Sequence, residues 1–153
     1  MSAYPGGHAG FLAVALATHA LVGYALGAVL FDRAGAGLVG GVVADVDLLV
    51  PASVGPPFAH RGVTHSALAL GVATAVGLRF GRATAGGVFV GYLSQLLVDA
   101  TTPMGIPILS PLSGTYVGVD LDPGGHSLPV TAALWVACLG LLWSRGKLDL
   151  PGR

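Results

Sequence analysis

The segment FAHRGVTHS, residues 58–66, concentrates side chains that bind metals and anions. It holds His60 and His65, two of the five histidines, and Arg61, one of the seven cationic residues. Histidine nitrogens are ligands of catalytic zinc, and a guanidinium binds phosphate or carboxylate through paired hydrogen bonds. Thr64 would cap a following helix, whose first backbone N–H groups favour an anion. The segment therefore predicts metal chemistry on an anionic substrate.

Three further segments carry histidine or aspartate within apolar sequence. His19 lies in ATHALVGYALG, Asp45 and Asp47 lie in VADVDLL, and Asp99 ends GYLSQLLVD. Ionisable side chains within a membrane are costly and are normally paired, face a cavity or are functional. A divalent cation would neutralise the carboxylates and so permit them in a low-dielectric setting. The expected metal ligands are His19, Asp45, Asp99 and one or both of His60 and His65.

Zinc or manganese suits this donor set, and magnesium is an alternative. A bound ion would lower the pKa of a water molecule and polarise a phosphoryl or acyl oxygen. Asp47 points about 200° away from Asp45 on a regular helix, so either one of them binds metal and the other orients a ligand, or the helix opens at this point. We expect Asp47, or a histidine that does not bind metal, to act as the general base. Arg61 is expected to hold the anionic group of the substrate.

Each of these residues also has a purely structural interpretation. His19 would form a hydrogen bond between helices, and the aspartates of VADVDLL would cap a helix end. The histidines of FAHRGVTHS would lie at the membrane interface. Asp99 would form a structural ion pair with Arg61. His8 and His126, in glycine-rich sequence, are expected to be ordinary loop histidines.

Five apolar runs predict the elements that position these side chains. Their approximate bounds are 10–31, 34–50, 64–78, 83–100 and 128–143. The first has 22 residues without a charged side chain, enough to cross a bilayer core. Such a core is about 30 Å thick and a helix rises about 1.5 Å per residue. The shorter runs require tilting or local thinning of the bilayer. We predict an all-α, multi-pass bundle of five transmembrane helices, or four if the second run is re-entrant.

Cationic residues orient this bundle in the cell membrane. Six of the seven follow the first, third or fifth run: Arg33, Arg79, Arg82, Arg145, Lys147 and Arg153. Because cytoplasmic loops are enriched in cations, the N-terminus is predicted outside and the C-terminus inside. The candidate metal ligands then meet in the outer half of the bundle.

The composition agrees with a single membrane domain over residues 1–153. The chain is 54% hydrophobic and 9% charged, whereas soluble domains have about 25% charged residues. A net charge of zero gives no indication of a basic surface for nucleic acid, so the expected partners are membrane lipid and a small-molecule or lipid substrate. The 25 glycines include three pairs with small-xxx-small spacing, which favour close helix packing in lipid: Gly23 and Gly27, Gly77 and Gly81, Gly87 and Gly91.

Five short motifs follow one another along the chain: TH (18–19), DVD (45–47), HRGVTHS (60–66), GYLSQLLVD (91–99) and TPMGIPILSPLSG (102–114). In this order they resemble the motifs of the YdjM-like membrane-bound metal-dependent hydrolases. HRGxTHS is the most specific of them, and the resemblance covers about residues 15–114. It implies an inner-membrane protein with hydrolase activity and a divalent metal. A looser similarity to zinc-dependent phospholipases C implies lipid phosphoesters as substrates.

One residue departs from that pattern, since Gln95 stands where the family has histidine. An amide oxygen is a weaker zinc ligand than imidazole, which favours a harder metal, a single metal or lost activity. The leading hypothesis is a membrane-embedded, metal-dependent hydrolase of a phosphoester or ester. The alternatives are a small transporter or channel that uses the same polar cluster, and a non-catalytic membrane scaffold.

Overall fold

The computed structural model describes residues 4–55, 57–121 and 124–148. Within these ranges the chain forms five α-helices: α1 (Gly7–Phe31), α2 (Ala34–Val42), α3 (Ala67–Leu78), α4 (Arg82–Ala100) and α5 (Leu128–Ser144). Three short 3₁₀ segments complete the helical structure: η1 (Val43–Leu49), η2 (Ala52–Val54) and η3 (Val63–His65). Extended pairing in the described residues is limited to one bridge, between Ile106 and Val117. The prediction of an all-α fold is confirmed.

Each α-helix coincides with one of the five apolar runs. The second run is divided, because α2 ends at Val42 and the backbone continues as η1. The third run begins later than predicted, since Val63–His65 forms η3 and α3 starts at Ala67. Ser66 caps α3 by accepting a hydrogen bond from the backbone N–H of Ala69, so the cap predicted at Thr64 belongs to Ser66 instead. The polar motifs therefore lie in 3₁₀ segments and loops next to the helices.

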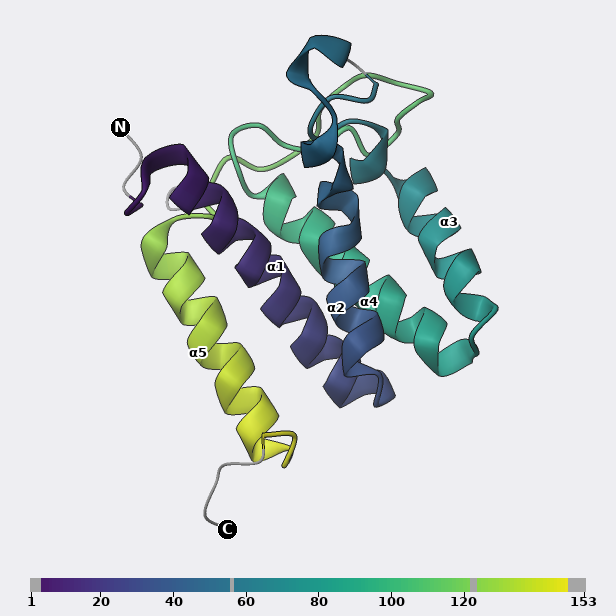
Figure 1. The fold of residues 1–153 in the computed structure, drawn as a ribbon, viewed down its shortest axis with the longest axis vertical. Coiled ribbons are helices and arrows are strands. Elements are labelled where there is room, and N and C mark those ends of the chain that lie inside the picture. Colours follow the sequence, from purple (N-terminus) through teal and green to yellow (C-terminus); the bar gives the residue numbers. More distant parts are fainter. Residues whose placement is uncertain (1–3, 56, 122–123, 149–153) are drawn as a thin grey trace.

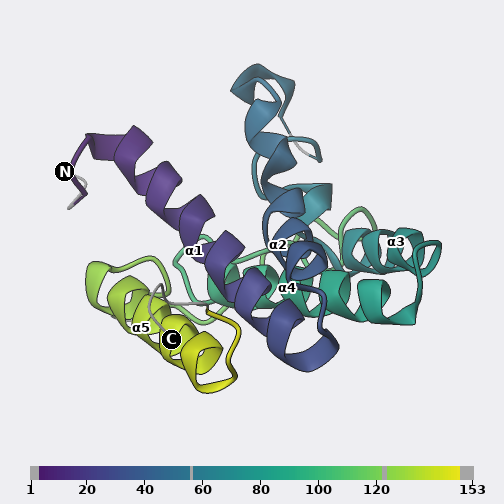
Figure 2. The ribbon, with the colours of Figure 1, turned by 60° about the horizontal axis from the view of Figure 1, so that its bottom comes forward.

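Helices α1, α2 and α4 pack against one another and form the centre of the bundle, with α3 against α4 and α5 against α1 (Figure 1). Successive helices alternate in direction, as both views show (Figures 1 and 2). As a result η1, η3, the end of α4 and the start of α5 lie at one end of the bundle. The turns that follow α1 and α3, and the end of α5, lie at the other.

Glycine makes the contact among the three central helices. A Cβ atom on Gly37 of α2 would lie 2.1 Å from the carbonyl oxygen of Gly23 in α1. A Cβ atom on Gly91 of α4 would lie 2.0 Å from the carbonyl oxygen of Gly37. Gly77 packs its backbone against Ala85, whereas Gly81 lies in the turn before α4 with a φ of 108°. The backbones therefore approach too closely for any side chain at the central positions.

By length and composition, one helix in the described part of the chain is suited to cross a bilayer, namely α1. Helices α3 and α5 are apolar but shorter. The described cations of the predicted cytoplasmic side lie at one end of the bundle: Arg33, Arg79, Arg82, Arg145 and Lys147. Arg153 lies outside the described residues. The number of crossings stays a prediction.

Candidate metal centre

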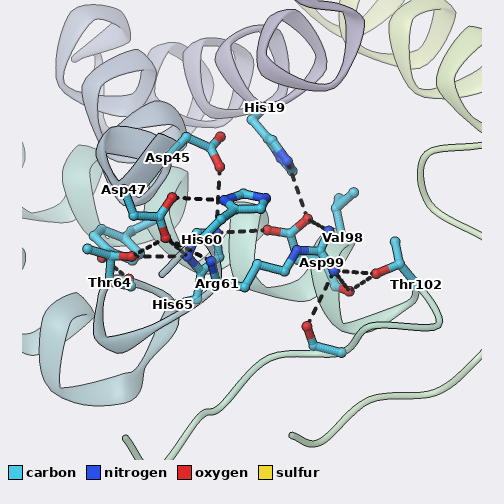
Figure 3. Close-up of polar contacts among 12 residues, drawn as sticks. His19, Asp45, Asp47, His60, Arg61, Thr64, His65, Val98, Asp99 and Thr102 are labelled. Atoms are coloured by element: carbon cyan, nitrogen blue, oxygen red, sulfur yellow. Dashed lines mark hydrogen bonds and ion pairs between the residues drawn. The ribbon is translucent and has the colours of Figure 1, made fainter. Parts of the chain in front are cut away.

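Four segments that are distant in the sequence meet at the end of the bundle opposite these cations (Figure 3). His19 comes from α1, Asp45 and Asp47 from η1, His65 from η3 and Asp99 from the last turn of α4. Except for Asp45, which is partly buried, these side chains are at most 2% exposed. His60 and Arg61 enter the same cluster from the loop between η2 and η3. The structure thus brings together all seven residues named from the sequence.

Asp47 is the centre of a hydrogen-bond network. Its Oδ1 atom lies 2.9 Å from His60 Nδ1. Its Oδ2 atom accepts hydrogen bonds from the Arg61 backbone N–H (2.9 Å) and the Thr64 hydroxyl (2.7 Å), and it lies 3.1 Å from His65 Nδ1. Both oxygens are therefore occupied within the protein. This geometry favours an orienting role for Asp47 over a role as the general base.

His65 presents its other ring nitrogen to two carboxylates. Nε2 lies 3.2 Å from Asp99 Oδ2 and 3.6 Å from Asp45 Oδ1, and it is buried without a hydrogen-bond partner. Ligand atoms about 2.1 Å from a tetrahedral ion lie about 3.4 Å from each other. The two distances from Nε2 match this spacing, and ligand atoms of the three residues all lie within 4.8 Å of one another. These residues fit a divalent metal.

The electrostatics of His65 reflect the surrounding acids. Segment η3 lies in the loop before α3, outside the spanning helices. Burial lowers the pKa of the imidazole, but the attraction of the nearby carboxylates of Asp45, Asp47 and Asp99 outweighs burial and raises the pKa to about 10. A proton on His65 partly compensates three carboxylates that face only one guanidinium. A divalent cation would take over that compensation.

The guanidinium of Arg61 is bound to Asp99 and does not extend into open space. Its NH2 atom lies 2.6 Å from Asp99 Oδ1, and its NH1 atom donates to the Thr102 hydroxyl (2.5 Å) and to the Gly105 carbonyl (3.3 Å). Only Nε lacks a partner, and it is buried. The backbone at Arg61 has a φ of 57°, an uncommon value for a residue with a side chain. The geometry thus agrees with the structural ion pair between Asp99 and Arg61 that the sequence left open. Of the three guanidinium nitrogens, only Nε has no partner in the protein and could bind a substrate anion.

Two histidines lie on the same side of Asp99 as Arg61. His19 Nε2 is 3.6 Å from Asp99 Oδ1, and His126 Nε2 is 2.9 Å from the same atom. His126 is 8% exposed and its Nδ1 atom has no partner, so the expectation of an ordinary loop histidine is wrong. The position of His126 in the sequence does indicate that it belongs to the cluster. It lies two residues before the fifth apolar run, at the membrane level of the other histidines.

Two cavities adjoin the cluster. One has a volume of about 30 Å³ and its lining includes His19, Asp45, His60, Asp99 and His126. A volume of about 10–15 Å³ on this measure is enough for one water molecule. The second has a volume of about 1150 Å³ and is open to the surface. Its polar lining includes His60, Arg61 and His126, and its apolar lining includes Phe11, Leu48, Met104 and Leu121.

Gln95 lies one turn before Asp99 on α4. It is completely buried, and neither polar atom of its amide has a hydrogen-bond partner. Buried amides are normally hydrogen bonded, so this position is unusual for a structural residue. The unpaired amide stands at the position where the resemblance implies a histidine.

Comparison with known proteins agrees with this picture. The model of the YdjM inner membrane protein family matches residues 14–150, which extends the resemblance past residue 114 to include His126 and α5. No curated protein and no solved structure matches the chain. The match establishes a location in the cell membrane. The chain belongs to the YdjM inner membrane protein family.

Proposed function

We propose that this protein is a membrane-embedded, metal-dependent hydrolase of a phosphoester or ester in a lipid-like substrate. The observation that carries the proposal is the convergence of His65 Nε2, Asp45 Oδ1 and Asp99 Oδ2 beside a small cavity. Three protein ligands with an open position are typical of catalytic rather than structural zinc sites. All five helices are proposed to cross the bilayer, with the cluster in the outer half.

The metal ligands in this proposal are Asp45, His65 and Asp99. A divalent ion held there supplies Lewis-acid chemistry and lowers the pKa of a water molecule. With neutral imidazoles, one such ion and the Arg61 guanidinium balance the formal charges of the three aspartates. This balance favours a single ion. Zinc and manganese suit the donor set, and magnesium remains an alternative.

The remaining polar residues position the ligands and handle the proton. Asp47 orients His65 through Nδ1, as a carboxylate does behind many metal-bound histidines. His60 is proposed as the general base, because Asp47 fixes its Nδ1 atom and its side chain is 35% exposed beside both cavities. Arg61 and His126 hold Asp99 through Oδ1, with His19 nearby, so that Oδ2 stays directed at His65.

The substrate class follows from the larger cavity. Its apolar walls suit a hydrocarbon chain, while His60, Arg61 and His126 stand where a polar head group would lie. All residues that line the two cavities belong to the end of the bundle with the cluster, and the α1 residues among them lie between His8 and His19, in the first half of that helix. The central helices meet through glycine backbones toward the other end. A closed inner end favours an enzyme over a channel.

Metal analysis of protein purified in detergent tests the proposal. After incubation with zinc, manganese or magnesium and removal of free ions, the wild type is expected to retain one ion per chain. His65→Ala is expected to lose it, whereas His8→Ala, which changes an exposed histidine, is expected to keep it. A wild type that retains no divalent ion would contradict the metal centre. Retained metal without cleavage of any carboxylic or phosphoric ester of a lipid would contradict the hydrolase.

A further inference from the structure

Two loops cover the end of the bundle that holds the candidate metal centre (Figure 1). We call residues 48–55, 57–59 and 102–119 the outer cap. None of these segments contains a charged residue or a histidine. Loops that face water normally carry polar and charged side chains. The composition of the outer cap therefore does not match a solvated loop.

The outer cap exposes large apolar side chains. These residues are Leu48, Leu49, Val54, Phe58, Met104, Leu109, Leu112, Tyr116, Val117 and Val119. Leu112 is 93% exposed and Leu49 is 82% exposed. Single exposed apolar residues are common on soluble proteins, but extended groups of them mark an interface with a protein or a membrane.

The length of α3 indicates which interface this is. With 12 residues, α3 is about 18 Å long, well short of a hydrocarbon core of about 30 Å. Its outward face is apolar along its whole length, with Leu68, Val72 and Val76 each more than half exposed. Because α3 starts where the outer cap begins, the cap continues the apolar surface past the helix. Lipid along α3 would therefore meet the cap next.

The backbone of the outer cap is compatible with this setting, since much of its polar backbone is paired internally. Ile106 and Val117 exchange two hydrogen bonds of 2.8 and 3.0 Å. The N–H of Val119 donates to the carbonyl of Ala100, and the carbonyl of Ile108 accepts from the N–H of Ala67. Pro103, Pro107 and Pro111 have no N–H to satisfy. Irregular backbone does not face the hydrocarbon core of a bilayer, and at membrane depth it is tolerated only where protein or water covers it. The cap backbone is therefore expected at the interfacial level of the leaflet, with its exposed apolar side chains directed toward the acyl chains.

We infer that the outer cap is embedded in the lipid leaflet on the side of the candidate metal centre, with phospholipid acyl chains as its occupants. Met104 of the cap also lines the larger cavity. A lipid would therefore reach that cavity from the leaflet without passing through water. The inference rests on the membrane location and on the exposed residues, and it does not require the protein to hydrolyse lipid.

Spin labels measure this placement directly. Leu112→Cys and Leu109→Cys are made in a Cys138→Ala background, because Cys138 is the one cysteine of the chain. Each is labelled with a nitroxide and reconstituted into phospholipid nanodiscs, and its collision rates with oxygen and with a water-soluble nickel chelate are compared. Arg79→Cys, at the exposed end of α3, is the control. Leu112 is almost fully exposed, so its replacement removes little packing.

A cap in the leaflet makes the ratio of oxygen to nickel collisions several-fold higher at 112 and 109 than at 79. Nickel collisions at 112 and 109 equal to those at 79 would place the cap in water and overturn the inference. Low rates with both reagents would mean that a second copy of the chain covers the cap, and this would overturn it as well. Neither result depends on metal binding or catalysis.

Discussion

Asp47 holds the imidazole of His65 through Nδ1, 3.1 Å from Oδ2, and thereby turns Nε2 toward Asp45 and Asp99. The carboxylate fixes the orientation of the ring, and in a neutral ring it would favour the tautomer with the proton on Nδ1. Such an arrangement raises the basicity of a histidine ligand. The same aspartate also holds Nδ1 of His60, so one carboxylate prepares two imidazoles. The cluster is thus ordered around Asp47, even though Asp47 is not among the proposed ligands.

Asp47→Asn is expected to weaken metal binding without removing a ligand. Replacement of an orienting carboxylate costs about 10–100-fold in affinity. The measurement is a calorimetric titration of metal-depleted protein with zinc and with manganese. Asp120→Asn is the matched control, because Asp120 is an exposed aspartate on the rim of the larger cavity. Equal affinities for the wild type and Asp47→Asn would show that the ring of His65 needs no such support.

Metal affinity is expected to rise with pH. Its surroundings raise the pKa of His65 to about 10, so the metal-free ring carries a proton at pH 6–8 that an ion must displace. Displacement of one proton gives about a tenfold gain in apparent affinity per pH unit. Titrations at pH 6, 7 and 8, in buffers of different ionisation enthalpy, report both the slope and the number of protons released. Binding that is independent of pH would exclude His65 as a ligand.

Arg61→Ala is expected to destabilise the fold as well as the site. Loss of one partner of a buried ion pair costs about 3–5 kcal/mol, because the other charge stays buried. Here Asp99 would keep His126 but lose the guanidinium at 2.6 Å. The thermal unfolding midpoint in detergent should fall sharply. A small change would mean that Arg61 is available to bind a substrate anion.

Arg61→Lys separates charge from geometry. An ammonium keeps the positive charge but lacks the planar fork that reaches Asp99, Thr102 and Gly105 together. We expect intermediate stability, with a larger loss in the metal-depleted protein than in the metal-loaded protein, since a bound ion also compensates Asp99. Equal losses in the two states would argue against an ion at Asp99.

The helices could be predicted from the sequence because each one corresponds to a continuous run of apolar residues. The bounds of the apolar runs agree closely with those of α1, α4 and α5, because each of these helices ends near the residue where its apolar run ends. The exception is VADVDLL, where the apolar pattern continues but the backbone changes from α2 to η1 at Val43. Hydropathy does not distinguish an α-helix from a 3₁₀ turn. In η1, the carboxylates of Asp45 and Asp47 lie close to the His65 imidazole of η3, and local sequence does not reveal this contact.

The types of residue in the site were predictable, but their roles were not. Histidines and aspartates in apolar sequence, at one predicted membrane level, indicate a polar cluster, and the structure brings them together. Whether Arg61 faces a substrate or Asp99 depends on Thr102 and Gly105, which lie about 40 residues later. His126 was missed because its partner Asp99 is 27 residues away and no local pattern connects them. Pairings of this kind are a property of the fold.

Gln95→Leu is expected to stabilise the metal-free protein. Both polar atoms of this buried amide lack partners, and replacement of an unsatisfied polar group by an apolar one of similar shape gains about 1–3 kcal/mol. Thermal unfolding of metal-free protein in detergent gives the difference, and Gln95→Asn, which keeps the amide, is the control. A fall in stability for Gln95→Leu would mean that the amide binds a water molecule or an ion.

The glycine contact between the central helices gives a prediction that is independent of the site. Gly37→Ala places a methyl group 2.1 Å from the carbonyl oxygen of Gly23, so α1 and α2 must separate. Gly71→Ala in α3 is the matched control, because a Cβ atom there meets nothing within 4 Å. An alanine in an open helical position gains up to about 1 kcal/mol over glycine. Unfolding midpoints in detergent should therefore fall for Gly37→Ala and hold or rise for Gly71→Ala. Because η1 follows α2 directly, Gly37→Ala should also weaken metal binding through Asp45. Equal midpoints for the two variants would show that α1 and α2 do not meet through glycine.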